Sequence, residues 1–154
     1  MNEESWTPPH EHESNPYPPS QDPTITLETA GRLTAITIDD LVALPGKTVP
    51  DCLIVSTGHG PSGPFSFTGV PLGDLIARYV KGNWATAIVL SGDGFGAMVT
   101  AEEADVQLAR PVLLALEVDG RPLEREDGLV RLIMPNENED ALRQVKWIEK
   151  IRVR

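Results

Sequence analysis

Short strand-like segments, separated by glycine- and proline-rich turns, run from residue 24 to the end of the sequence, and this pattern limits the fold most. Two of them, residues 51–57 (DCLIVST) and 86–91 (TAIVLS), are continuous apolar runs typical of buried central strands. Further strands are predicted at 24–28, 97–99, 111–118, 129–135 and 145–153. The strands and short helices intermix without regular βαβ spacing. We therefore expect an α+β domain, with a mixed β-sheet and short flanking helices.

Three short helices are predicted from capping signals and apolar spacing. One capping box predicts a helix over 38–44, and a second predicts a helix from Thr100 to about Leu108. Pro71 suits the first turn of a third helix. The stretch 58–69 (GHGPSGPFSFTG) holds four glycines and two prolines, so we expect a loop there.

The composition changes sharply near residue 24. Residues 1–23 hold six of the 14 prolines and five acidic residues, but no Lys or Arg. Such a segment cannot bury enough apolar surface to offset the entropy lost on ordering. We expect a disordered, proline- and acid-rich tail at 1–23 and one folded domain over 24–154.

Charge and cysteine content exclude several classes of function. The chain carries 13 Lys and Arg against 23 Asp and Glu, a net charge of −10. Binding to nucleic acid or to an anionic membrane surface is therefore not expected. No apolar run approaches the ~20 residues of a membrane span, and no secretory signal is visible, which predicts a soluble, cytoplasmic protein. A single cysteine, Cys52, excludes an internal disulfide and a cysteine-rich metal site.

Three features of the sequence could carry chemistry. His59 lies in the first glycine-rich loop, where it is either an acid–base or ligand-contacting group or an ordinary exposed histidine. Cys52 lacks basic neighbours in sequence, which favours a buried, inert thiol over a nucleophile. The segment 92–96 (GDGFG) has neither the spacing of a dinucleotide-binding fingerprint nor a P-loop lysine, and is typical of a tight turn.

Taken in order, several segments between about residues 25 and 153 resemble the molybdopterin-binding domain of the sulfite oxidase family. The resembling segments are ITIDDLVALP (36–45), CLIVSTGHG (52–60), FTGVPLGDLI (67–76), SGDGF (91–95), LLALEVDGRPL (113–123), VRLIMP (130–135) and VKWI (145–148). Each segment is short, but their shared order predicts the fold of that family. The resemblance implies an oxidoreductase domain that binds a molybdenum cofactor.

The resemblance also implies which residues surround the cofactor. In the family, molybdenum is held by the two sulfurs of the pterin dithiolene and by one cysteine thiolate. Aligned on Thr57 and Gly58, the cysteine position falls at Val55, and Cys52 lies three residues earlier. Phe95 stands where the family has a tyrosine. The cofactor-binding residues implied are Val55, Ser56, Thr57, Gly58, His59, Asp93, Gly94, Phe95, Arg131 and Lys146. No metal ligand and no catalytic residue is assigned.

Three functions remain open on the sequence. The first is a molybdopterin-dependent oxidoreductase with a degenerate site. The second is a catalytically inactive domain of this fold, which binds a small-molecule ligand or a partner protein. The third is a subunit whose site is completed by a partner chain.

Overall fold

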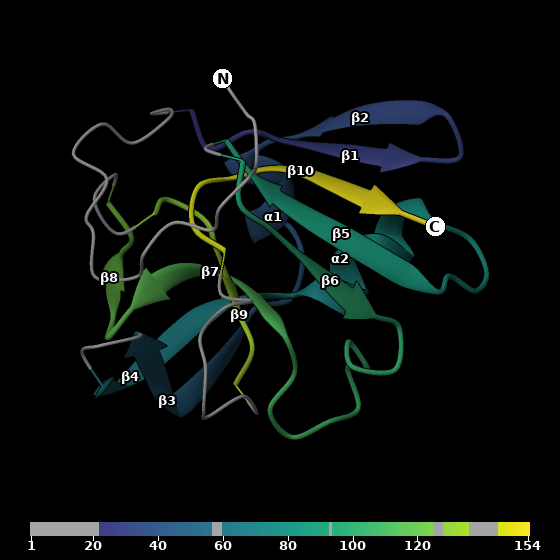
Figure 1. Ribbon diagram of the computed structural model, residues 1–154. Helices are drawn as coiled ribbons and strands as arrows, with labels where there is room; N and C mark the ends of the chain where they lie inside the picture. The colour runs from purple at the N-terminus through teal and green to yellow at the C-terminus, as the bar shows by residue number, and fades with distance from the viewer. Residues whose placement is uncertain (1–21, 57–59, 93, 125–127, 136–144) are drawn as a thin grey trace.

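The computed structural model describes residues 22–56, 60–92, 94–124, 128–135 and 145–154, leaving out the side chains of 54–56 and 60–62 (Figure 1). All but the last two residues of the predicted tail lie outside this description. In chain order the elements are β1 (Ile25–Thr29), β2 (Arg32–Ile36), α1 (Ile38–Val42), β3 (Lys47–Ser56), β4 (Gly60–Pro71), α2 (Leu72–Tyr79), β5 (Thr86–Ser91), β6 (Gly96–Thr100), β7 (Leu113–Val118), β8 (Arg121–Pro122), β9 (Arg131–Ile133) and β10 (Ile148–Val153).

The strands form two sheets. The first sheet has the order β2-β1-β10-β5-β6 and is mixed, because β1 and β10 are parallel while the other neighbours are antiparallel. The second sheet has the order β3-β4-β7-β8, and β9 also pairs with β7; all of its pairs are antiparallel. In Figure 1 the yellow β10 lies between β1 and β5, so the two ends of the described chain meet in one sheet. The predicted α+β class is confirmed.

Alternation along the strands of the first sheet builds the main core. Ile25 and Leu27 of β1 are buried, as are Ile151 and Val153 of β10, while the residues between them face outward. Helix α2 adds its predicted apolar face, and each such buried aliphatic side chain contributes about 1.5–3 kcal/mol. A second core packs on the second sheet and consists of Val49, Cys52, Phe67, Leu113, Ala115, Val118, Leu123 and Ile133.

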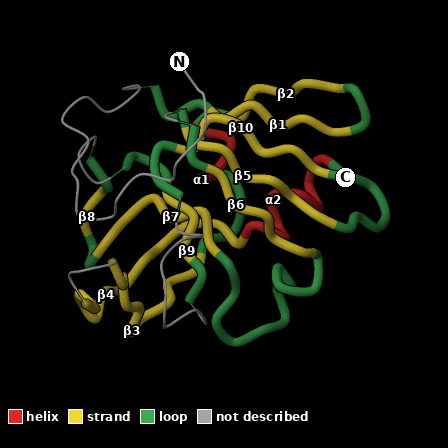
Figure 2. Tube along the Cα trace, viewed as in Figure 1, coloured by secondary structure: helices red, strands yellow, loops and turns green. Residues whose placement is uncertain are grey.

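The two described helices are short, as Figure 2 shows in red. Helix α1 begins at the predicted capping box: Asp40 donates its N–H to Thr37 Oγ1 (3.2 Å), and Thr37 donates its N–H to Asp40 Oδ2 (2.9 Å). These hydrogen bonds with Thr37 lower the pKa of Asp40 below its ordinary value. The helix ends at Val42, before the predicted Leu44. Neither described helix has the length and apolar character needed to cross a bilayer.

The helix predicted from Thr100 to Leu108 is wrong, although its capping box forms. Thr100 Oγ1 accepts the Glu103 N–H (3.1 Å), and Glu103 Oε1 accepts the Thr100 N–H (3.0 Å). The chain then continues in turns, because Asp105 Oδ1 accepts the Gln107 N–H (2.9 Å). A short aspartate side chain competes in this way with the helical hydrogen-bond pattern.

The loop predicted at 58–69 is also wrong, because most of this stretch belongs to the twelve-residue strand β4. Its glycines allow close strand packing. A Cβ at Gly69 would overlap the carbonyl oxygen of Leu114 in β7 and lie 2.7 Å from Ala115 Cα. Gly63 has φ +116 and lies at the register shift between the Cys52–Phe65 and Ile54–Ser62 pairs. Here glycine marks a bulge and a close backbone approach within a strand.

Candidate functional site

Two of the predicted cofactor-binding residues, Arg131 and Lys146, approach the same glycine. A Cβ at Gly128 would lie 2.9 Å from Lys146 Cβ and 3.1 Å from Arg131 Cγ. Gly128 has φ +105, a conformation that side chains disfavour. The stems of both cationic side chains therefore pack against a position without a side chain. We call Gly128, Arg131 and Lys146 the basic cradle.

The charged ends of the cradle lie on aromatic rings. The Arg131 guanidinium lies over Phe67, 5.9 Å from the ring centroid, and the Lys146 ammonium lies 5.6 Å from the Trp147 centroid. Arg131 is 7% exposed, whereas Lys146 is exposed. A nearly buried guanidinium in a chain of net charge −10 is a concentrated positive group, suited to bidentate anion recognition.

Hydrogen bonds and strained backbone fix the segments around the cradle. Trp147 donates its N–H to Gly128 O (2.9 Å), and Leu132 donates to Val145 O (2.8 Å), so the segments before β10 and around β9 run side by side. Leu129 (φ 57) and Trp147 (φ 50) adopt the left-handed conformation, which is uncommon for non-glycine residues. Such strain is found most often at functional sites.

The second predicted loop lies beside the cradle. Gly92 donates its N–H to Trp147 O (3.1 Å), and Ser91 donates to Phe95 O (2.7 Å), which closes the tight turn. Gly94 occupies φ +94 in this turn. The half-buried Phe95 packs on the main core, and Asp93 lies outside the described residues. The structure thus places Gly92 next to Trp147, the residue that follows Lys146 of the cradle.

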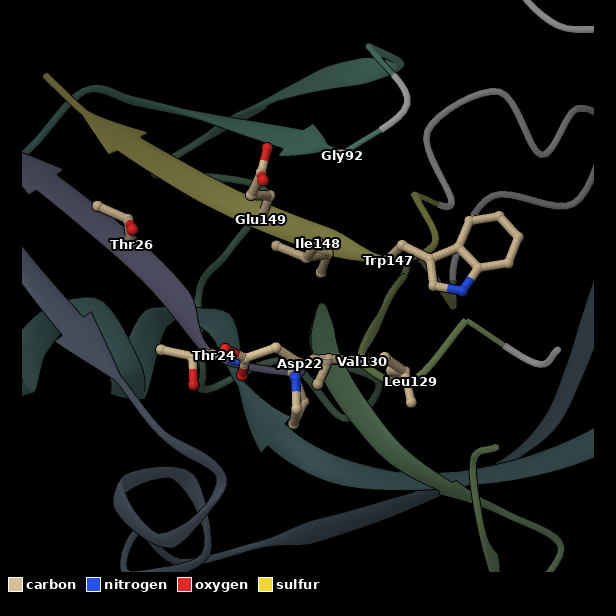
Figure 3. Close-up of a pocket in the computed structure, with 10 residues that line it drawn as sticks. Asp22, Thr24, Thr26, Gly92, Leu129, Val130, Trp147, Ile148 and Glu149 are labelled. Atoms are coloured by element: carbon tan, nitrogen blue, oxygen red, sulfur yellow. The ribbon is translucent and has the colours of Figure 1, made fainter. Parts of the chain in front are cut away.

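A cavity of about 240 Å³ lies next to these segments, between the starts of β1 and β10. Figure 3 shows Asp22 and Thr24 on one side, Ile148 and Glu149 on the other, and Trp147 toward one end. The cavity lining is part apolar and part acidic. A hydrogen bond from the Thr24 N–H lowers the pKa of Asp22, which keeps that carboxylate ionised. Anions are therefore better accommodated at the cradle than inside this cavity.

The remaining predicted residues lie at the end of the β3–β4 hairpin. Val55 pairs with Pro61, and Ser56 pairs with Gly60. Thr57, Gly58 and His59 lie outside the described residues, as do the side chains of Val55 and Ser56. Their predicted cofactor contacts stay predictions.

Cys52 is a buried thiol, as predicted. It is 1% exposed, and its Sγ donates to Val49 O (3.4 Å). Burial raises the pKa of the Cys52 thiol above its ordinary value, and the nearby Arg110 guanidinium opposes this shift. Among the described side chains, no group of three or more His, Cys, Asp or Glu is placed to hold a metal ion.

Sequence reasoning missed two residues of this region. In the sequence, the only feature that marks Gly128 is the dipeptide Asp127-Gly128, and this dipeptide is typical of an ordinary turn. Arg110 carried none, yet its guanidinium donates to three backbone carbonyls, at Pro50 (2.6 Å), Asp51 (3.1 Å) and Pro135 (3.2 Å).

Comparison with known proteins identifies a family and a structural neighbour. Residues 19–154 match the family model of the oxidoreductase molybdopterin binding domain. The fold is similar to the crystal structure of the sulfane dehydrogenase SoxCD from Paracoccus pantotrophus, with a TM-score of 0.70 and 21% identity. The match covers 86% of this chain but only 38% of that one. No curated protein sequence matches the chain.

Proposed function

We propose that this chain, which belongs to the family of oxidoreductase molybdopterin binding domains, holds a molybdopterin cofactor by its phosphate at the basic cradle. The observation that carries this proposal is the approach of Arg131 and Lys146 to the bare Cα of Gly128. Two cations on adjacent, hydrogen-bonded segments offer the positive charge that a phosphate needs. Hydrogen bonds between such cations and phosphate oxygens are the strong, charge-assisted kind.

The residues present fit the phosphate end of the cofactor. Arg131 is fixed by its burial and by the Phe67 ring, so it would bind a phosphate with little loss of side-chain entropy. Lys146 is exposed and would add a mobile point charge. The hydrogen bond from Gly92 to Trp147 O holds the tight turn beside the cradle, so Gly94 and Phe95 would lie on the same side as the bound phosphate.

The residues present do not fit a thiolate ligand for molybdenum. By the resemblance of the motifs, the family's cysteine position falls at Val55 in this chain. Cys52 is buried in the second core and hydrogen-bonded to Val49, so its thiol is not offered to a metal. We propose that the cofactor is held without a cysteine ligand. A molybdopterin cofactor, when bound, supplies two-electron redox chemistry.

The alternative function is a redox-inactive domain of this fold that binds another small ligand or a partner protein. The position and burial of Cys52 favour it. So does the cavity between β1 and β10, whose volume of about 240 Å³ would admit a small molecule and whose Asp22 and Glu149 would favour a neutral or cationic one.

Two substitutions test the cradle. Lys146→Met and Arg131→Met should each lower the pterin content of protein purified from a host that makes molybdenum cofactor. We expect roughly a tenfold or greater loss of affinity, because each removes a charged hydrogen-bond donor. Arg32→Met is the matched control, since Arg32 is exposed on β2 of the first sheet. Pterin is measured by fluorescence after oxidation, and folding by circular dichroism.

The two functions predict different outcomes. Pterin in the wild type and the control, with a loss in both cradle variants, supports the proposal. Lys146 is exposed, so its variant should remain folded even if Arg131→Met does not. Equal pterin in all four proteins would refute the cradle as the binding site. A folded wild type without any pterin would favour the alternative.

A further inference from the structure

We propose that Arg110 is a positioning residue that sets the separation of β3 and β9, the two strands that lead to the predicted cofactor-binding residues. The inference rests on the proposed function. Arg110 lies in the turn-rich segment before β7, and it donates hydrogen bonds to the backbone of Pro50, Asp51 and Pro135 and, at 4.0 Å, to Cys52 Sγ. Arg110 would therefore act on the cofactor site indirectly, by fixing the backbone positions of the two strands.

One guanidinium spans two strands that are not neighbours. Arg110 Nη1 donates to Pro50 O (2.6 Å), and Nη2 donates to Asp51 O (3.1 Å), both in β3. Nη2 also donates to Pro135 O (3.2 Å), two residues beyond the end of β9. In the second sheet, β4 and β7 separate β3 from β9. Arg110 therefore links the interior of β3 to the segment just beyond β9.

The two β3 carbonyls that accept hydrogen bonds from Arg110 belong to a bulge. The β3–β4 register shifts between Val49 and Cys52, and neither Pro50 nor Asp51 has a cross-strand partner in the described pairing. Asp51 has φ 58, the left-handed conformation. A bulge of this kind bends its strand and leaves backbone groups that need other partners. The guanidinium supplies those partners and so fixes the direction of β3 beyond the bulge.

Both linked segments lead to predicted site residues. Val55 follows Asp51 by four residues along β3, and Arg131 precedes Pro135 by four residues through β9. A shift at either end of the link would therefore move one side of the cofactor site relative to the other. Displacements of about 1 Å are enough to weaken a positioned site.

Lysine cannot replace this arginine. The guanidinium donates in a rigid, planar fork, whereas an ammonium is a single point charge on a flexible stem. Arg110→Lys keeps the positive charge but loses the fork, and Arg110→Met loses both. A positioning role predicts similar defects in the two variants. A purely electrostatic role, in which Arg110 attracts an anionic cofactor, predicts that Arg110→Lys behaves as the wild type.

The first measurement is hydrogen–deuterium exchange of the cofactor-free chain, which does not depend on the proposed function. In both Arg110 variants, peptides covering β3 and β9 should exchange about tenfold faster or more, the change expected for loss of one hydrogen bond to a charged group. Peptides covering β1 and β10 should be unchanged. Ile151→Val is the matched control, because it destabilises the main core without touching the link. It should raise exchange without singling out β3 and β9.

The second measurement is pterin content after expression with cofactor synthesis. Both Arg110 variants should retain at least about tenfold less pterin than Ile151→Val at a temperature where all three are folded. Uniform exchange across both sheets, wild-type behaviour of Arg110→Lys, or local exchange with unchanged pterin would each overturn the inference. A wild type that binds no pterin would instead overturn the proposed function, and the exchange data would then show only what Arg110 does for the fold.

Discussion

At the scale of single residues, the site depends on a glycine that sequence reasoning did not select. Arg131 and Lys146 were predicted from their motifs, but the feature that joins them is the missing side chain of Gly128. Contacts of this kind arise between segments that are distant in sequence. A motif gives the type of each residue, and only the fold gives the position that they share.

Gly128→Ala should therefore damage the site more than an ordinary glycine substitution. The new Cβ would meet both cationic stems, and we expect it to cost about 1–3 kcal/mol of stability beyond the cost of backbone strain. Gly120→Ala is the matched control, because Gly120 also has positive φ (83°) but a Cβ added there would meet no atom within 4 Å. Urea denaturation measures stability, and pterin content measures binding. Equal losses in the two variants would contradict the cradle.

The buried Cys52 thiol gives stability a specific pH dependence. Its pKa is raised by burial above the ordinary value of 9.0, so the unfolded chain ionises this thiol first as the pH rises. The stability that Cys52 contributes is therefore complete below about pH 8 and is lost at higher pH. The free-energy difference between wild type and Cys52→Ala should shrink between about pH 8 and about pH 10 in urea titrations. A constant difference would show that the thiol ionises equally in both states.

Among the helices and strands, hydrogen bonding determines the secondary structure of a segment more than its composition does. The Thr37 and Thr100 capping boxes both form, yet only the first opens a helix, because Asp105 turns the chain after the second. In the same way, glycines and prolines predicted a loop where β4 is a strand between β3 and β7. Cross-strand pairing there outweighs local propensity, and sequence alone does not reveal the partner strands.

Helix α1 offers a test at this scale. Thr37→Ala removes the side-chain cap and should cost about 1 kcal/mol at neutral pH. The Thr37 backbone N–H, which the variant keeps, and the Thr37 hydroxyl, which donates to Asp40 Oδ2 (3.0 Å), both lower the pKa of Asp40. The stabilisation that the hydroxyl gives is therefore present above about pH 4 and is lost as the pH falls through that lowered value. Urea denaturation at about pH 7 and about pH 3 should show a smaller loss at the lower pH. The same loss at both pH values would mean that the box contributes through Thr37 alone.

At the scale of the whole molecule, the order of the motifs predicted the family, and the predicted α+β class with short helices is confirmed. The interior strand β5 and the edge strand β6 were found because apolar runs and alternation persist in them. Strands β2 and β8 were missed, since each is short and largely exposed. The division into two sheets was not predicted either. It depends on pairing between strands that are far apart in the sequence, such as β1 and β10.

The proposed function has this chain bind a molybdopterin cofactor without a cysteine ligand. The most direct measurement is the molybdenum and pterin content per chain of the wild-type protein, purified from a host that makes the cofactor. We predict pterin at close to one per chain, with a content that is unchanged in Cys52→Ala. A folded protein with no pterin would contradict the claim of binding. Loss of the cofactor in Cys52→Ala, with the fold intact, would contradict the claim that no cysteine holds it.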